Sequence, residues 1–148
     1  MIDFFEAAQR LGAAAAIGGA LGLNRNVRGK PVGLKTLALV CIGAAAFVMI
    51  CADMAEPDRA DAVSRVMQGV ATGIGFVGAG AILRDANTGE IEGLTTATSV
   101  WVTAALGCAC GLGEWRIALA AVVITTIVLM FGKSFQKLVR RAIGRPDE

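Results

Sequence analysis

An uncharged stretch of 18 residues, 66–83, constrains the fold of this chain more than any other feature. That length is about the minimum for a helix that crosses the hydrocarbon core of a bilayer. Gly69, Gly73 and Gly80 fall on one face of such a helix, and Gly75 and Gly78 open a second face. Small residues let helices approach closely in lipid, where apolar burial does not hold them together. The stretch therefore predicts a membrane helix at the centre of a bundle, either for close packing alone or for an irregular backbone that lines a ligand.

The letters GIGFVG within this stretch also fit the G-x-G-x-x-G fingerprint of dinucleotide-binding folds. That fingerprint follows a strand, opens an amphipathic helix and needs an acidic residue about 20 positions later. Here the preceding residues, SRVMQGVAT, contain no β-branched run, and Glu92, the carboxylate at that distance, lies beside another apolar run. The context therefore argues against nucleotide binding.

Composition indicates a membrane protein and excludes several kinds of chemistry. Apolar residues make up 55 % of the chain before its 19 glycines are counted, against about 45–50 % with glycine included in soluble domains. The absence of histidine excludes histidine-based metal sites and acid–base catalysis. A net charge of +2 is too small to indicate nucleic acid as a partner. The cysteines lack C-x-x-C spacing and are interpreted as buried, inert thiols; they are Cys41, Cys51, Cys108 and Cys110.

Five apolar runs predict an all-α, polytopic membrane bundle of about five transmembrane helices, with the glycine-rich third helix central. The runs cover residues 4–23, 36–52, 66–83, 94–113 and 117–132. Two further close-packing signatures, Gly18-x-x-x-Gly22 and Gly107-x-x-x-Gly111, lie in the first and fourth runs. The connections are a basic turn at 24–35, an acidic stretch at 53–65, a hydrophilic hairpin at 84–93 and a short polar turn at 114–116.

The distribution of cations predicts the orientation in the membrane. Residues 1–132 are expected to form the transmembrane domain, and residues 133–148 a basic tail. With five spans, ten of the 14 Lys and Arg residues lie on the side that holds the first and third connections and the tail. Cations are retained in the cytoplasm, so we expect the tail to be cytoplasmic and the N-terminus to lie outside. The tail is expected to meet anionic lipid head groups.

Three motifs, in order along the chain, resemble the signatures of one membrane-protein family. The first, GLNRNVRGKPVGLKT, covers residues 22–36 after the first predicted helix. The second, GIGFVGAG, covers residues 73–80, and the third, GLTTATSVW, covers residues 93–101. The similarity extends from about residue 11 to residue 131. By these motifs the chain is identified as similar to the MgtC/SapB family.

The resemblance implies a bacterial inner-membrane protein of about five helices. The family is tied to growth at low magnesium and to survival inside host phagocytes, and hence to virulence. Its best-known members bind and inhibit the F-type ATP synthase, and the resemblance does not imply that the protein itself carries magnesium. Longer members continue into a soluble domain that resembles ACT domains, and residue 148 comes before any such region. We therefore expect no role that depends on that domain.

The motifs supply the candidate interaction residues. Their cations near the first turn are expected to form a cytoplasmic basic patch, and Asn24 to bond backbone carbonyls of that turn. Arg84 is expected to pair with Thr95 and Thr96 at the membrane boundary. As an alternative, the hydroxyls of the fourth run, up to Thr103, line a polar path. The full set is Asn24, Arg25, Gly29, Lys30, Pro31, Lys35, Gly73, Gly75, Gly78, Gly80, Arg84, Thr95, Thr96 and Trp101.

Two functions remain open from the sequence. The first is a regulatory or interaction protein without cofactor, whose partners are membrane lipids, another membrane protein or a second copy of the chain. The second is a small transporter or channel for Mg²⁺ or another ion, with Asp85, Glu90 and Glu92 as candidate ligands. The central runs contain no carboxylate and no evident inverted repeat, which argues against transport. No nucleophile–base pair indicates an enzyme.

Overall fold

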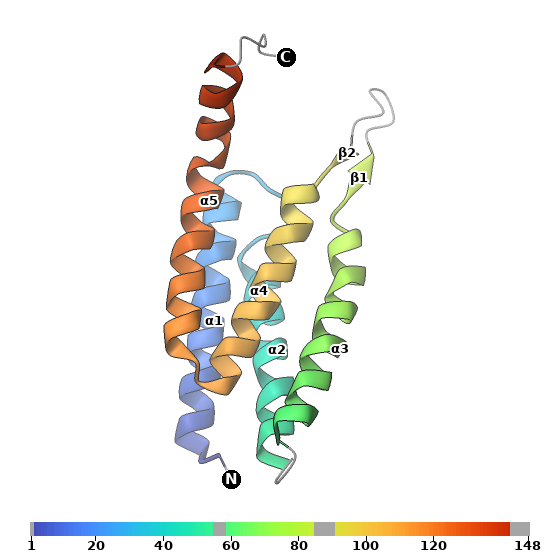
Figure 1. The fold of residues 1–148 in the computed structure, drawn as a ribbon, viewed down its shortest axis with the longest axis vertical. Coiled ribbons are helices and arrows are strands. Elements are labelled where there is room, and N and C mark those ends of the chain that lie inside the picture. The colour runs from blue at the N-terminus through green and yellow to red at the C-terminus, as the bar shows by residue number, and fades with distance from the viewer. Residues whose placement is uncertain (1, 55–58, 85–90, 143–148) are drawn as a thin grey trace.

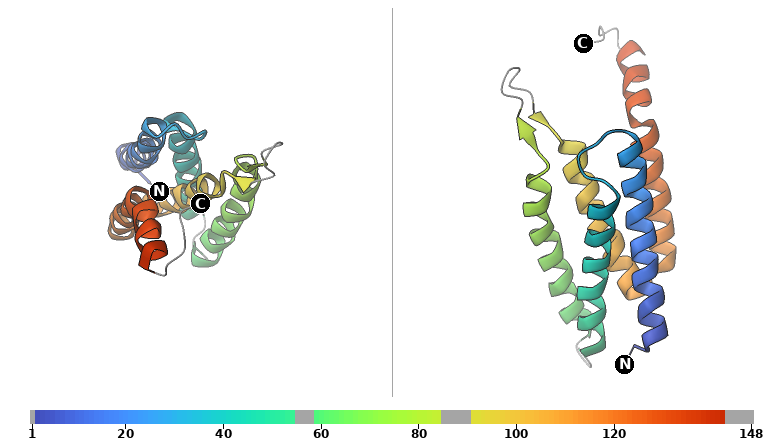
Figure 2. Two further views of the ribbon diagram at one scale, coloured as in Figure 1. Left: turned by 90° about the horizontal axis from the view of Figure 1, so that it is seen from above. Right: turned by 180° about the vertical axis from the view of Figure 1, so that it is seen from behind.

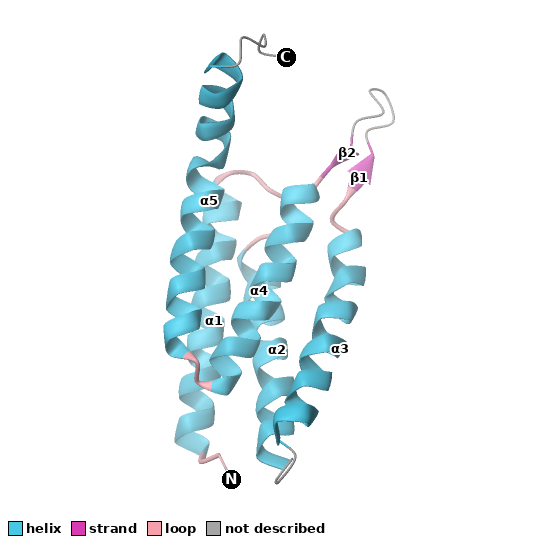
Figure 3. Ribbon diagram, in the orientation of Figure 1, coloured by secondary structure: helices cyan, strands magenta, loops and turns pink. Residues whose placement is uncertain are grey.

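The computed structural model describes the backbone of residues 2–54, 59–84 and 91–142, and their side chains except at 83–84 and 133–142. Five helices lie side by side, and a short hairpin joins two of them (Figure 1 and Figure 3). The predicted all-α bundle is confirmed. The elements are α1 (Phe4–Val27), α2 (Leu34–Met54), α3 (Arg59–Ala79), β1 (Leu83–Arg84), β2 (Ile91–Glu92), α4 (Leu94–Leu112) and α5 (Trp115–Ala142).

Three of these helices are long and apolar enough to cross a membrane: Leu34–Met54, Leu94–Leu112 and Trp115–Gly132. The other two, α1 and α3, run beside them at the same depth of the bundle (Figure 1). Their lower hydropathy follows from their composition, because α1 contains Glu6 and Arg10, and α3 contains Gln68 and several glycines. The bundle therefore has the architecture of a polytopic membrane protein.

The helix at the centre of the bundle is α4, so the prediction that the third helix is central was wrong. α4 packs against α1, α2, α3 and α5, and the view from above shows it between the others (Figure 2). α3 lies at the edge, where it packs against α2 and α4. Within α3 only Val63 and Gly78 are buried. The reason is that no neighbouring helix comes within 4 Å of the place where a Cβ on Gly69, Gly73 or Gly75 would lie.

Close packing is instead supplied by four glycines on α1 and α4, which we call the packed glycines: Gly18, Gly22, Gly107 and Gly111. A Cβ placed on Gly18 would lie 2.5 Å from the Leu37 carbonyl oxygen, and one on Gly111 would lie 2.5 Å from that of Ala45. Gly22 and Gly107 approach the chain at Leu34 and Cys41 in the same way. The two predicted G-x-x-x-G signatures thus hold α1 and α4 against α2.

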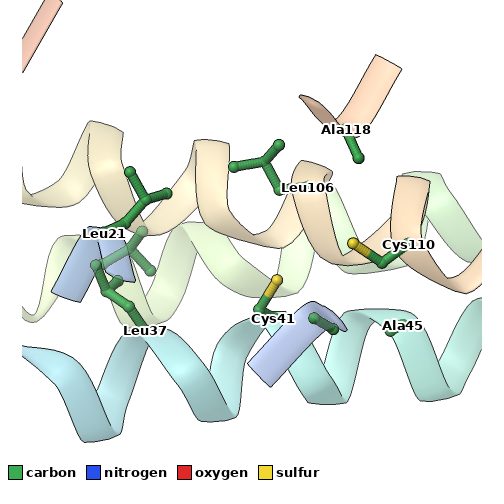
Figure 4. Packing of buried hydrophobic residues seen from close by; sticks show 9 residues of the cluster. Leu21, Leu37, Cys41, Ala45, Leu106, Cys110 and Ala118 are labelled. Carbon is green, nitrogen blue, oxygen red and sulfur yellow. The ribbon is translucent and has the colours of Figure 1, made fainter. Parts of the chain in front are cut away.

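The core between α1, α2 and α4 contains small and medium-sized side chains (Figure 4). Leu37 and Cys41 of α2 are fully buried, and Leu106 and Cys110 of α4 are 2 % and 0 % exposed. The packed glycines bring the helices so close that larger side chains would not fit between them. Cys41, Cys108 and Cys110 are free, buried thiols, as the sequence predicted, whereas Cys51, for which the same was predicted, is free and only half-buried.

Two helix boundaries differ from the apolar runs. α3 begins at Arg59, seven residues before its apolar run, because Asp61 in the first turn interacts favourably with the helix dipole. It ends at Ala79, so Gly80 lies in the turn before the hairpin, where Leu83 pairs with Glu92. α5 continues past residue 132 to Ala142. The predicted domain boundary therefore falls within a continuous helix.

The two ends of the bundle differ in charge. The basic end holds the turn between α1 and α2, the hairpin and the last turns of α5 (Figure 1). The opposite end holds the N-terminus and the turn between α4 and α5 (Figure 1).

Gly113 in the turn between α4 and α5 adopts the left-handed conformation, with φ of 75°, and ends α4.

Candidate functional site

A buried arginine at the basic end is the most unusual polar feature of the bundle. Arg25 lies in the last turn of α1 and is 4 % exposed. Gly22, one turn earlier on the same face, brings the end of α1 against the start of α2. The Arg25 side chain therefore enters the space between α1 and α4 instead of reaching water.

Arg25 is held by hydroxyl and carbonyl oxygens, which together we call the Arg25 site. Its Nη1 donates to Ser99 Oγ at 2.9 Å, and its Nη2 donates to Thr96 Oγ1. Its Nε donates to the Val32 carbonyl oxygen at 3.2 Å. The guanidinium therefore joins α1, α4 and the turn before α2 through one planar fork.

The α4 hydroxyls are oriented by their own helix. Ser99 Oγ donates to the Thr95 carbonyl oxygen at 2.6 Å, and Thr103 Oγ1 donates to the Ser99 carbonyl oxygen at 2.7 Å. A hydroxyl that donates its proton to the backbone keeps its lone pairs as acceptors. Ser99 thus presents an acceptor to Arg25, and Thr103, fully buried, extends this polar stripe by one turn.

The charge of Arg25 has no carboxylate partner in the described part of the chain. The ion pair described there joins Arg10 and Glu6 near the other end of α1. Arg25 lies in the last turn of α1, where the negative end of the helix dipole favours a cation, and Thr96 lies in the first turn of α4, where the dipole end is positive. The buried charge of the Arg25 guanidinium itself repels Mg²⁺ or another cation at this point between α1 and α4.

A second arginine joins the same two helices at the opposite end. Arg10 Nη1 donates to the Gly111 carbonyl oxygen at 2.6 Å, and its Nη2 pairs with Glu6. Gly111 belongs to the last turn of α4, where backbone carbonyls lack helical partners. The backbone amide of Ile2 also donates to Asp53 at 2.6 Å. α1 is therefore fixed to the bundle by polar contacts at both ends.

The first motif is placed differently from the prediction. Lys30, Pro31 and Lys35 are exposed, as a basic patch requires, but Arg25 is buried and does not belong to that patch. Gly29 has φ of 65° and turns the chain after α1. The predicted bonds from Asn24 to carbonyls of this turn are not formed within the described residues, where Asn24 is half-buried.

The third motif contains the hydroxyls that bind Arg25. Thr96 is buried and Thr95 exposed, so Thr96 pairs with Arg25 from the first motif. The side chain of Arg84, which was expected to pair with both threonines, lies outside the described residues. Trp101 of this motif is 52 % exposed on the surface of α4.

No group of three or more metal-ligating side chains occurs among the described residues. Of the three candidate metal ligands, Glu92 is exposed on β2, and Asp85 and Glu90 lie outside the described residues. Of the hydroxyls near the start of α4, those of Thr96 and Ser99 accept from Arg25, and that of Thr98 donates to the Leu94 carbonyl oxygen.

The glycines of the second motif are divided between two uses. Gly78 is buried against α4, where a Cβ on it would lie 3.6 Å from Ala97, and Gly80 follows the end of α3. A Cβ on Gly73 or Gly75 would meet no atom within 4 Å, and the same holds for Gly69. All three therefore leave bare, exposed backbone, Gly69 and Gly73 beside α2 and Gly75 on another face of α3.

One face of α3 combines one of these bare glycines, Gly75, with polar side chains. We define the open face of α3 as Gln68, Thr72, Gly75, Phe76 and Ala79, which are all exposed. Four of them follow the 4-3-4 spacing of a single helix face, and Phe76, beside them, is 87 % exposed. Gln68 and Thr72 form no side-chain hydrogen bond in the described structure.

Fold and site together define a small, polytopic, α-helical membrane protein. The chain belongs to the MgtC family, whose profile matches residues 11–138. The family predicted from the three motifs is thus confirmed. No solved structure matches the chain.

Three relatives illustrate the range of the family. Protein SrpB of Synechococcus elongatus is 40 % identical over 146 residues, which cover 92 % of this chain and 80 % of SrpB. The Escherichia coli K12 protein named Putative magnesium transporter YhiD is 42 % identical over 126 residues, 81 % of this chain and 57 % of YhiD. Protein MgtC of Salmonella typhimurium LT2 is 38 % identical over 112 residues, 76 % of this chain and 46 % of MgtC. The chain thus spans about half the length of YhiD and MgtC.

Proposed function

We propose that this protein is a non-enzymatic regulator in the bacterial inner membrane, which acts by binding another membrane protein through the open face of α3. One observation carries the proposal: Gln68 and Thr72 lie near the middle of α3, exposed and without side-chain partners in the described structure. In hydrocarbon, a side-chain amide without a hydrogen bond is unfavourable by several kcal/mol, roughly 2–7. A facing helix with polar groups would satisfy it.

The lipid-facing surface of α5 provides the contrast. Its exposed side chains include Val123, Ile124 and Val128, which are 55 %, 62 % and 61 % exposed and purely apolar. Such a surface is satisfied by lipid tails alone. The open face of α3 combines a bare glycine, which permits close backbone approach, with groups that lipid tails cannot hydrogen-bond.

The interior of the bundle supports regulation over ion transport. The packed glycines close α1 and α4 onto α2, and Arg25 places a buried positive charge at the basic end of α1 and α4. A cation passing between these helices would meet both barriers. Transport of Mg²⁺ is the alternative function, which the name of YhiD suggests.

The resemblance supplies a first candidate for the partner, the F-type ATP synthase, and low-magnesium adaptation as the physiological setting. In this proposal the N-terminus lies outside and the basic end of the bundle lies in the cytoplasm, as the distribution of cations predicts. The open face of α3 then meets its partner within the bilayer.

Substitutions on the open face test the proposal. Gly75→Leu and Gln68→Leu are introduced in the native host at low magnesium, with Gly75→Ala as the matched control that keeps the site small. We expect both leucine variants to reach the membrane at the normal level, to lose the growth phenotype and to lose co-purification with the partner. Normal function of both variants would contradict the proposal.

A flux measurement tests the alternative. Purified protein in proteoliposomes is expected to carry no more Mg²⁺ than empty liposomes, with an ionophore as positive control. Saturable flux that is lost in Asp85→Asn or Glu90→Gln would overturn the regulatory function and establish a transport pathway through the hairpin.

A further inference from the structure

A second surface of α3 borders an apolar groove that the open face does not include. The groove lies between α2 and α3, which run side by side (Figure 1 and Figure 2), and has a volume of about 560 Å³. All of its lining residues are apolar or glycine, and the argument uses Leu39, Gly43 and Phe47 of α2 and Gly69, Gly73 and Val77 of α3. A Cβ on any of the three glycines would meet no atom within 4 Å, so bare backbone forms the floor of the groove.

The groove begins next to a positive charge. Lys35 precedes Leu39 by one helical turn on α2 and is exposed, and Thr36 beside it is also exposed in the first turn of α2. The free backbone amides of that turn add a positive dipole end. Residues 24–36 contain four Lys or Arg residues and no Asp or Glu. A phosphate group at the top of the groove would therefore meet an ammonium, a hydroxyl and a helix N-terminus.

The length of the groove matches one leaflet of the bilayer. From Lys35 to Phe47, α2 advances about 18 Å at 1.5 Å per residue. Half of a hydrocarbon core of about 30 Å is about 15 Å. A transmembrane helix would need a groove of the full thickness, whereas an acyl chain from the leaflet at the basic end needs only this length.

We propose that the groove between α2 and α3 is a binding site for an anionic phospholipid, with one acyl chain along Gly43, Gly69 and Gly73 and its phosphate at Lys35 and Thr36. The absence of side chains at the glycines leaves space for the acyl chain, and the Lys35 ammonium favours an anionic head group over a zwitterionic one. This proposal does not depend on a protein partner at the open face of α3.

Native mass spectrometry of the whole protein, released from nanodiscs of equal phosphatidylglycerol and phosphatidylcholine, tests the site. We expect the wild-type protein to retain one phosphatidylglycerol in clear preference. Lys35→Gln should lower that preference about fivefold, the contribution of one surface cation. Arg116→Gln removes the same charge at the opposite end and should leave the preference unchanged.

Substitutions that fill the groove test the binding of the acyl chain independently of the binding of the head group. Gly73→Leu, or Gly43→Leu if the first variant fails to fold, should remove the retained lipid of either kind. The proposal would be overturned if Lys35→Gln retained phosphatidylglycerol and phosphatidylcholine in the wild-type ratio. It would also be overturned if a folded leucine variant retained the lipid. The experiment distinguishes lipid binding in the groove from partner binding at the open face of α3, because Gly75→Leu on the open face should leave lipid retention intact.

Discussion

The packed glycines of α1 and α4 and the bare glycines of α3 show two opposite uses of the same residue. At Gly18 and Gly111 a single added carbon would lie 2.5 Å from a backbone oxygen of α2. At Gly69, Gly73 and Gly75 the same carbon would meet nothing within 4 Å. The first set determines how the bundle closes, and the second set leaves a surface that the described chain does not cover.

The difference shows what a glycine pattern indicates in a membrane helix. Spacing of three or four residues shows that glycines share a face, but it does not show whether a neighbour of the same chain covers that face. The polar content of the helix supplies the missing information. Where exposed Gln68 and Thr72 accompany the glycines, a partner outside the chain is expected; where alanine and leucine accompany them, as around Gly18, the partner is internal.

The largest expected effect is the loss of the closed bundle in Gly107→Leu. A Cβ at this position would lie 2.9 Å from Ala44 Cβ and against the Cys41 carbonyl oxygen. We expect a loss of about 3 kcal/mol or more in the free energy of unfolding, because the leucine side chain fits only if the backbones of α2 and α4 move apart. Reversible unfolding in mixed micelles measures it. Gly73→Leu is the matched control and should change stability by less than about 0.5 kcal/mol; equal losses in the two variants would remove the distinction between packed and bare glycines.

Arg25→Lys should have the next largest effect. An ammonium cannot make the three bonds that the Arg25 fork makes to Ser99, Thr96 and the Val32 carbonyl. We expect a loss of about 2 kcal/mol, as hydrogen bonds to charged groups contribute about 1.5–3 kcal/mol. Arg28→Lys, at an exposed arginine bonded to the Leu129 carbonyl, should cost much less. A double-mutant cycle with Thr96→Val should give a coupling energy of about 1 kcal/mol, and additive effects would show that the Arg25–Thr96 contact is not stabilising.

Gly113→Ala tests the junction of α4 with Arg10. The φ of 75° costs a side-chain-bearing residue about 1–2 kcal/mol, and the new Cβ would lie 3.1 Å from Arg10 Nη2. Gly29→Ala, at φ of 65° with no atom within 4 Å, should show the backbone cost alone. Thermal unfolding of both variants measures the difference, and a larger loss at Gly29 would contradict the contact with Arg10.

Gly75→Ala should have the smallest effect and the opposite sign. Alanine in a helix interior is about 0.5–1 kcal/mol more stable than glycine, and no atom lies where the methyl group would go. The same measurement on Gly18→Ala should show a loss, because that methyl group would meet the α2 backbone. If both substitutions stabilised the protein, Gly18 would not be a packed position.

The sequence predicted the helices well because long apolar runs leave a membrane chain few alternatives. It also predicted that Gly18, Gly22, Gly107 and Gly111 form close-packing faces, but their spacing did not show that α2 is the helix that both faces contact. The glycine pattern alone could not predict the position of α3, because it does not distinguish covered from bare faces. The polar residues Gln68 and Thr72 were the sequence signal that one face of α3 is not covered by the same chain.

The Arg25 site was also missed, for a related reason. Arg25 belongs to a basic stretch that resembles a cytoplasmic loop, and its partner Thr96 lies 71 residues away in the sequence. One signal was available: Gly18, Gly22 and Arg25 follow a 4-3 spacing and share one face of α1. A cation on the same face as two packed glycines is expected to point into the bundle.

The most direct measurement is a photo-cross-linking profile of α3 in native membranes. A photoreactive residue is placed in turn at Gln68, Thr72, Gly75 and Ala79, and at Val123 and Val128 on the apolar surface of α5 as controls. The account predicts cross-links to one membrane protein from the four α3 positions and to lipid alone from α5. Lipid adducts alone from α3, or cross-links confined to a second copy of this chain, would contradict a separate partner at the open face.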